Sequence, residues 1–125
     1  RAKADRLLDS SASDADGNAD DRRGTTSVFN GPSPDIRLAG SGEEEIAAVA
    51  AWIGDRLSLD KIRPAEIGIF VRSAAQTSRA SAAAERASLR AKVLDEALHV
   101  PANCASIATM HLGKGLEFRA VAVMA

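Results

Sequence analysis

The sequence has few cysteines and aromatic residues, and each shortage excludes a class of protein. The single cysteine, Cys104, excludes an internal disulfide and fits a reducing compartment. With no tyrosine, three phenylalanines and one tryptophan, the core has to be built from alanine, valine, isoleucine and leucine. The sequence contains neither a run of 18 apolar residues nor a signal peptide. We therefore expect a cytoplasmic protein without a membrane partner.

The sequence also lacks an excess of positive or negative charge. The formal net charge is −1, so the chain has no overall electrostatic signature of a nucleic-acid binder, and any contact with DNA has to be local. The phosphate-binding pattern G-x-x-x-x-G-K-[ST] is absent as well. The nearest approach is Gly113-Lys114, but Ala108 stands at the required first glycine and Gly115 at the required serine or threonine. The chain therefore lacks a phosphate loop of its own.

The first third of the chain is polar and weakly patterned. Residues 1–9 have the composition of a helix end, and residues 10–34 are expected to be rich in loops. Residues 35–39 alternate polar and apolar side chains, as a short strand would. The acidic run at 14–21 imitates a calcium-binding loop but lacks the glycine and the glutamate required at its sixth and twelfth positions. We expect no metal site here.

From residue 41 onward, helix and strand patterns alternate, which predicts an α/β fold with a mostly parallel sheet flanked by helices. The first expected helix follows a capping box at 41–44 and carries an apolar stripe at Ile46, Val49, Ala50, Ile53 and Leu57. A central strand at 66–72 comes next, and then a helix at 75–90 that breaks near Leu89. Residues within 92–98 form either a strand or a continuation of that helix, and buried strands are expected at 105–108 and 119–125.

The segment between the last two strands is the most informative part of the chain. Residues 109–118 read Thr-Met-His-Leu-Gly-Lys-Gly-Leu-Glu-Phe, so polar groups of four chemistries alternate with small or apolar residues. The flanking apolar runs predict that this cluster lies on a connection at a strand end. In open α/β sheets, ligands bind outside the carboxyl ends of the strands, where such loops emerge.

Residues 109–118 closely resemble motif V of the UvrD/Rep-type superfamily I DNA helicases, a Thr-x-His-x-small-Lys-Gly-Leu-Glu-Phe run followed by a hydrophobic strand. Gly113 departs from the alanine that is usual in the family. Residues 67–79 are similar to the family's strand ending in Arg-(Ser/Thr)-Asn-Ala-Gln, with Ala74 in place of the asparagine. The resemblance covers essentially the whole chain and implies an incomplete second RecA-like motor domain.

The resemblance also implies roles for individual residues. Glu117 would accept hydrogen bonds from the nucleotide ribose, and Gly115 and Lys114 would lie on the phosphate side of the ATP cleft. Thr109 and His111 would contact the phosphates of single-stranded DNA, where hydroxyl and imidazole groups serve as donors. For each of these residues the alternative is a structural role: a solvated glutamate, an exposed lysine, or a histidine satisfied within the fold.

Arg72, at the end of the predicted central strand, carries a guanidinium group suited to phosphate. A surface salt bridge explains it equally well. We therefore assign it to the DNA contact with that alternative open.

The sequence lacks the family's Mg²⁺-binding acidic motif and its arginine-bearing motif VI. It also begins at Arg1 and stops at Ala125 within an apolar run, so we expect a fragment of a longer protein. By resemblance, ATP binds between two RecA-like domains, with Mg²⁺ held by the absent parts. The expected partners are single-stranded DNA or duplex junctions and the first RecA-like domain. The alternatives are an inactive remnant that acts as a binding or scaffold module, and an unrelated RecA-like or Rossmann-like domain.

Overall fold

A computed structural model describes residues 11–13, 19–21, 31–95, 99, 101–113 and 115–125. The chain divides into two compact units, Arg1–Ile36 and Arg37–Ala125. In the first unit, strands β1 (Ser11–Ser13) and β2 (Ala19–Asp21) pair in antiparallel fashion, within a stretch that the sequence predicts to be rich in loops. The helix expected at 1–9 lies outside the described residues.

Residues 31–39 form neither a helix nor a strand, so the strand expected at 35–39 is wrong. Ile36 and Leu38 are 68% and 100% exposed. Alternation predicts a strand because one face of a sheet buries the apolar side chains. Here the apolar side chains remain in solvent, and the pattern alone does not stabilise an extended strand.

Four parallel strands form the sheet of the second unit, in the order β4-β5-β3-β6. Every residue of the central strand is buried, as the continuous apolar run predicts. The α/β class and the central parallel strand are therefore confirmed. The strands are β3 (Ile67–Val71), β4 (Ala91–Val93), β5 (Ala105–Thr109) and β6 (Ala120–Met124).

The first helix, α1 (Gly42–Ser58), begins at the predicted cap. The hydroxyl of Ser41 accepts the N–H of Glu44 at 3.2 Å, and the Glu44 carboxylate accepts the N–H of Gly40 at 2.7 Å. Three glutamates lie in the first turn, where the helix dipole favours negative charge. The chain then passes through a 3₁₀ turn, Pro64–Glu66, into β3.

The second helix, α2 (Thr77–Arg86), follows a 3₁₀ turn at Ala74–Gln76 and ends three residues before the predicted break at Leu89. Its carboxyl end is closed by two hydrogen bonds, from the Leu89 N–H to the Ala84 carbonyl and from the Ser88 N–H to the Glu85 carbonyl. Ser88 adopts the left-handed conformation that this cap requires, with φ 54°. Because the helix stops here, residues 91–93 form strand β4. Of the two alternatives predicted within 92–98, the strand is therefore confirmed and the continued helix is wrong.

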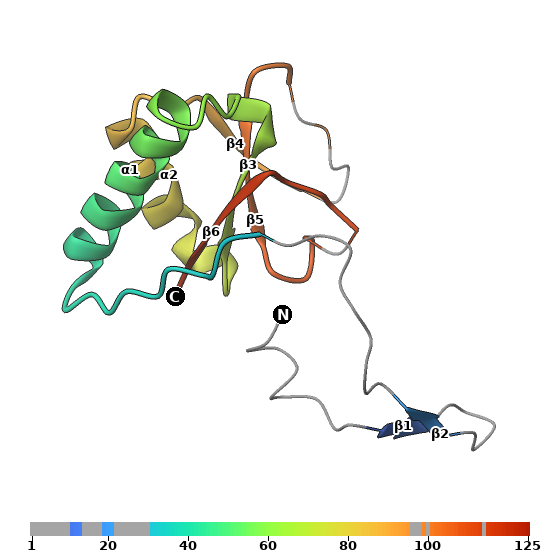
Figure 1. Cartoon of the computed structure of the whole chain (residues 1–125). Helices are drawn as coiled ribbons and strands as arrows, with labels where there is room; N and C mark the ends of the chain where they lie inside the picture. The colour runs from blue at the N-terminus through green and yellow to red at the C-terminus, as the bar shows by residue number, and fades with distance from the viewer. Residues whose placement is uncertain (1–10, 14–18, 22–30, 96–98, 100, 114) are drawn as a thin grey trace. The chain divides into compact units, whose positions relative to one another are not determined.

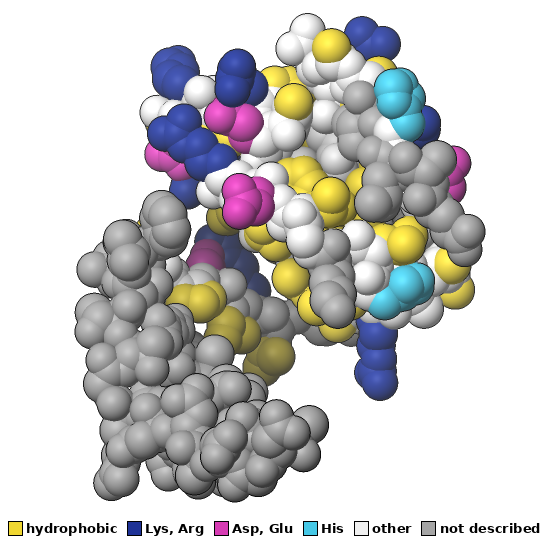
Figure 2. All heavy atoms as spheres, turned by 90° about the vertical axis from the view of Figure 1, so that its right-hand side faces the viewer, with side chains coloured by type: hydrophobic (Ala, Val, Ile, Leu, Met, Phe, Trp, Pro, Cys, Tyr) yellow, Lys and Arg dark blue, Asp and Glu magenta, His cyan; other side chains and the backbone are white. Residues whose placement is uncertain are grey.

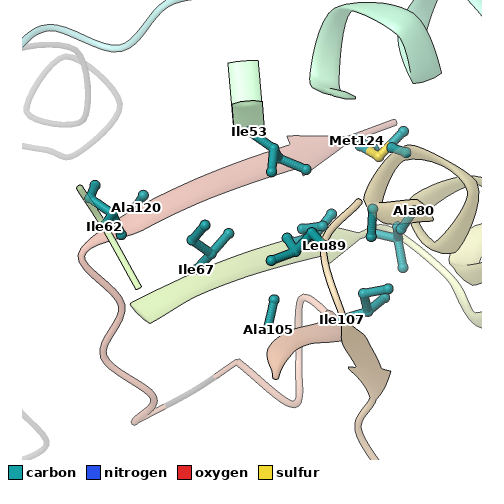
Figure 3. Close-up of a cluster of buried hydrophobic side chains, with 13 residues drawn as sticks. Ile53, Ile62, Ile67, Ala80, Leu89, Ala105, Ile107, Ala120 and Met124 are labelled. Carbon is teal, nitrogen blue, oxygen red and sulfur yellow. The ribbon is translucent and has the colours of Figure 1, made fainter. Parts of the chain in front are cut away.

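Both helices cover the same face of the sheet (Figure 1). Ile53 of α1 and Ala80 of α2 point toward side chains from β3, β5 and β6 (Figure 3). The stripe predicted for α1 is confirmed, because Ala50 and Ile53 are buried and the others pack against this core. The fully or nearly fully buried sheet residues on this face are Ile67, Ile69, Val71, Ala105, Ile107, Ala120 and Met124.

The other face of the sheet is covered partly by the connection from β5 to β6, residues 110–119, which we call the β5–β6 loop. In the strand order, the connection from β3 to β4 runs across the sheet in one direction, and the connection from β5 to β6 runs in the other. Two connections of the same handedness that run in opposite directions lie on opposite faces of the sheet. In agreement, α2 packs on one face and the loop lies on the other (Figure 1). A second apolar cluster forms under the loop, consisting of Phe70, Leu94 and Ala108 with Leu112, Leu116 and Phe118.

The last strand corrects one prediction. The run at 119–125 was expected to be buried, but β6 is an edge strand whose residues alternate between buried and exposed. Val121 and Val123 are 45% and 60% exposed because the β5–β6 loop covers the sheet over β3 and leaves this edge open. Within the described part of the chain, no helix combines the length and hydropathy needed to cross a membrane.

Candidate functional site

The carboxyl ends of β3 and β5 lie side by side and present three of the predicted site residues. The Met110 N–H donates to the Val71 carbonyl at 3.0 Å, so the residues that follow the two strands leave the sheet together. Arg72 follows β3 and is exposed, while Thr109 ends β5 and His111 follows it. The structure thus brings Arg72 and His111 together at the carboxyl ends of the strands.

Thr109 and His111 form a pair at this edge. The Thr109 side chain is buried, and its Oγ1 lies 3.1 Å from Nδ1 of the exposed His111 ring. When the hydroxyl donates to Nδ1, the ring proton resides on Nε2, on the far side of the imidazole. The contact with Thr109 therefore orients the ring, and Nε2 lies on the side of the ring away from Thr109.

Two turns carry the β5–β6 loop away from this edge. The Leu112 N–H donates to the Thr109 carbonyl at 3.0 Å, and the Leu116 N–H donates to the Gly113 carbonyl at 3.1 Å. Gly115 lies in the second turn with φ +82°, a conformation that glycine adopts without steric cost. A Cβ at this position would meet open space, so the conformation alone calls for glycine. Lys114 lies outside the described residues.

Glu117 lies at the far end of the loop. Its carboxylate group is exposed and borders a shallow pocket of about 260 Å³. Figure 2 shows this side of the molecule, where hydrophobic side chains and both histidines reach the surface. A carboxylate beside apolar walls can accept hydrogen bonds from a neutral polyol while the walls contact its carbon atoms. The pocket is lined by Ala65, Leu94, Pro101, Ala102, Ser106, Leu116, Glu117 and Phe118.

An ion pair stabilises the turn next to this pocket. Glu66 accepts hydrogen bonds from the Arg63 guanidinium at 3.2 Å and from the Arg63 backbone N–H at 2.9 Å. The side-chain hydrogen bonds, followed by the backbone bond, lower the pKa of Glu66 to about 2. The carboxylate therefore stays ionised, and the ion pair with Arg63 persists, well below the pH at which an ordinary glutamate is protonated.

The polar residues of 109–118 are divided between two ends of the sheet rather than gathered at one strand end. The loop starts beside Val71 at the carboxyl end of β3, and the Arg119 N–H donates to the Glu66 carbonyl at its amino end. Five residues of strand separate these two points, which is roughly 16 Å at about 3.3 Å per residue. One small ligand therefore cannot contact both His111 and Glu117.

Comparisons with protein-family models, curated proteins and solved structures find no match to this chain. Among the described residues, no three His, Cys, Asp or Glu side chains gather as ligands of a metal ion would.

Sequence reasoning missed two kinds of residue. Ser106 is a buried polar residue that lines the pocket, and no pattern in the sequence distinguishes it from the apolar residues of β5. Gly68 and Phe70 contact the β5–β6 loop from below. A signal was available for Gly68, because a glycine inside a central strand indicates close approach of another segment.

Proposed function

We propose that this chain is part of an ATP-dependent DNA helicase or translocase of the UvrD/Rep type, namely an incomplete second RecA-like motor domain. It contributes one wall of the ATP cleft and part of the track for single-stranded DNA. The first RecA-like domain of the same protein supplies the phosphate loop and Mg²⁺ ligands. Phosphoryl transfer itself depends on those parts.

The observation that carries the proposal is the way the β5–β6 loop sorts its side chains. Leu112, Leu116 and Phe118 turn toward the sheet and pack on its second apolar cluster. His111 and Glu117 remain exposed at the two ends of the loop. A plain turn between strands has no need for an exposed imidazole and an exposed carboxylate flanked by three half-buried apolar side chains that pack on the sheet. Such an arrangement favours a loop that binds ligands.

At the Glu117 end, the proposed ligand is the nucleotide. The carboxylate is an acceptor-only group that matches the vicinal hydroxyls of a ribose. Gly115 and Lys114 precede it, and the resemblance assigns them to the phosphate side of the cleft. The described lining of the pocket includes no cationic residue, so the phosphates have to be held by Lys114 and by the first RecA-like domain. ATP supplies the energy for translocation when it is hydrolysed there.

At the His111 end, the proposed ligand is single-stranded DNA. The carboxyl edge of a parallel sheet is where ligands bind in open α/β folds, and Arg72 and His111 both emerge there. Guanidinium and imidazole N–H groups bind phosphate oxygens without reading the base sequence. The buried hydroxyl of Thr109 acts through the imidazole by fixing its orientation.

We predict that His111→Ala in the full-length protein weakens binding of single-stranded DNA about tenfold, since one hydrogen bond to a charged group contributes roughly 1.5 kcal/mol. Fluorescence anisotropy with a labelled oligonucleotide measures this affinity. Thr109→Val, which removes only the hydroxyl, is expected to have a smaller effect of the same sign.

The matched control is His99→Ala, which removes the other histidine of the chain, an exposed residue between β4 and β5. Equal DNA affinity in the wild type and in His111→Ala would contradict the DNA assignment. A salt titration separates the two edge residues. Arg72→Ala should lower the slope of log K against log salt concentration by about 1, because it removes a permanent positive charge, and His111→Ala should change that slope less.

A further inference from the structure

Two reciprocal contacts hold the β5–β6 loop against the sheet. In the first, the ring of Phe118 in the loop lies over Gly68 of β3, where an added Cβ would be 2.7 Å from Phe118 Cδ2. In the second, the ring of Phe70 in β3 lies against Gly113 in the loop, where an added Cβ would overlap Phe70 Cε1 and lie 3.0 Å from Cζ. Each segment therefore offers one phenylalanine and receives the other on a glycine.

The two rings also contact each other. The centroids of Phe70 and Phe118 are 5.7 Å apart, with an interplanar angle of 70°, which is the edge-to-face geometry that aromatic pairs favour. Both rings belong to the second apolar cluster, together with Leu94, Ala108 and Leu112. The contacts thus form one interlocked unit, which we call the Phe–Gly lock, made of Gly68, Phe70, Gly113 and Phe118.

The glycines of the lock are needed for space rather than for backbone freedom. Among the described glycines, Gly115 alone has a positive φ, so Gly68 and Gly113 occupy backbone conformations open to other residues. Because they have no side chain, a phenylalanine ring can lie directly against their backbone. The usual alanine of the helicase family at 113 would therefore collide with Phe70, and positions 70 and 113 have to change together.

We propose that the four residues of the Phe–Gly lock are positioning residues, which fix the β5–β6 loop across the sheet and so set the spacing between His111 and Glu117. The proposal rests on the proposed function for the identity of the two ligands. The lock holds the loop near both site residues, since Gly113 lies two residues after His111 and Phe118 directly follows Glu117. An atom added between the loop and the sheet, as at Gly113, pushes the loop away from the sheet, which impairs two binding events about one strand length apart.

The first test is hydrogen–deuterium exchange on the full-length protein. Gly113→Ala should speed exchange at least tenfold at amides bonded within or next to the loop, those of Met110, Leu112 and Leu116. Amides of α1 should be unaffected. Adding Phe70→Leu, which removes the Cε1 and Cζ atoms, should return the loop amides to within threefold of the wild-type rate. Unchanged exchange in Gly113→Ala, or equal acceleration in α1, would overturn the proposal.

Gly115→Ala is the matched control. It strains the same loop through its positive φ but meets no neighbouring atom, so Phe70→Leu should not rescue it. Rescue of both variants by Phe70→Leu would show a general loosening of the cluster and would contradict a specific contact between 70 and 113.

The second test measures both ligands. In the full-length protein, Gly113→Ala should raise the KM for ATP and the Kd for single-stranded DNA, each at least fivefold, and Phe70→Leu should restore both. A merely structural role would lower the active fraction, and hence the apparent kcat, without moving KM or Kd. A wild type that binds neither ligand overturns the proposed function. A wild type that binds both, with KM and Kd unchanged in Gly113→Ala, overturns the positioning role alone.

Discussion

Replacing Ile69 with alanine is expected to lower the free energy of unfolding of this chain by about 3–4 kcal/mol. Ile69 is fully buried at the middle of β3, between β5 and β6, and packs in the main apolar core. The truncation removes apolar contacts and leaves a cavity that the strands on both sides prevent from collapsing. Total stabilities of domains are on the order of 5–15 kcal/mol, so the loss is a large fraction of the whole. Urea denaturation followed by circular dichroism measures it.

Val123→Ala is the matched control, because Val123 lies on the same sheet but is 60% exposed. Its substitution should change the unfolding free energy by less than about 1 kcal/mol. Equal losses in the two variants would contradict the topology with β3 at the centre and β6 at the edge.

Glu117→Ala in the full-length protein is expected to raise the KM for ATP about 10- to 100-fold. Hydrogen bonds to a charged group contribute roughly 1.5–3 kcal/mol, and each 1.4 kcal/mol corresponds to a factor of ten. Glu117→Gln keeps one acceptor oxygen and should have a smaller effect. Steady-state hydrolysis in the presence of single-stranded DNA gives KM and kcat separately.

A comparison of nucleotides makes this prediction specific to the ribose. The wild type should bind ATP more tightly than 2′,3′-dideoxy-ATP, and Glu117→Ala should lose that discrimination because the acceptor of the hydroxyl groups is gone. Glu85→Ala, which removes an exposed glutamate on α2, serves as the control. Discrimination that survives unchanged in Glu117→Ala would remove the assigned role.

Much of the second unit follows from patterns in the sequence. The cap at Ser41, the stripe of α1 and the apolar run of β3 each combine a local preference with burial in the same core, so local and global preferences agree. The end of α2 was placed three residues late. Its alanine-rich sequence has no strong breaker, and the helix closes with a serine in the left-handed conformation instead of glycine.

The candidate site was predictable only in part. The sequence predicts a loop between two strands with exposed polar residues, but not that the loop runs back along the sheet and separates His111 from Glu117. That path depends on which strand lies between β5 and β6, a property of topology and not of local sequence. The exposure of β6 escaped prediction for the same reason, since an apolar run has the same composition at an edge as at a centre.

The Phe–Gly lock illustrates the limit most clearly. The sequence predicts only that Gly113 is a small residue that loosens the loop, whereas in the structure it makes room for Phe70. The two positions are 43 residues apart (113 − 70), and no local pattern links them. Contacts of this kind become visible only when the loop is placed over the sheet.

The central claim is that one loop joins a nucleotide contact to a DNA contact. It is tested most directly by measuring the Kd of the full-length protein for single-stranded DNA with and without a non-hydrolysable ATP analogue. Because coupling between two sites is commonly 5- to 150-fold, the analogue is expected to change this Kd at least fivefold, and Glu117→Ala should abolish the change. A Kd that is the same with and without the analogue in the wild type would contradict the account.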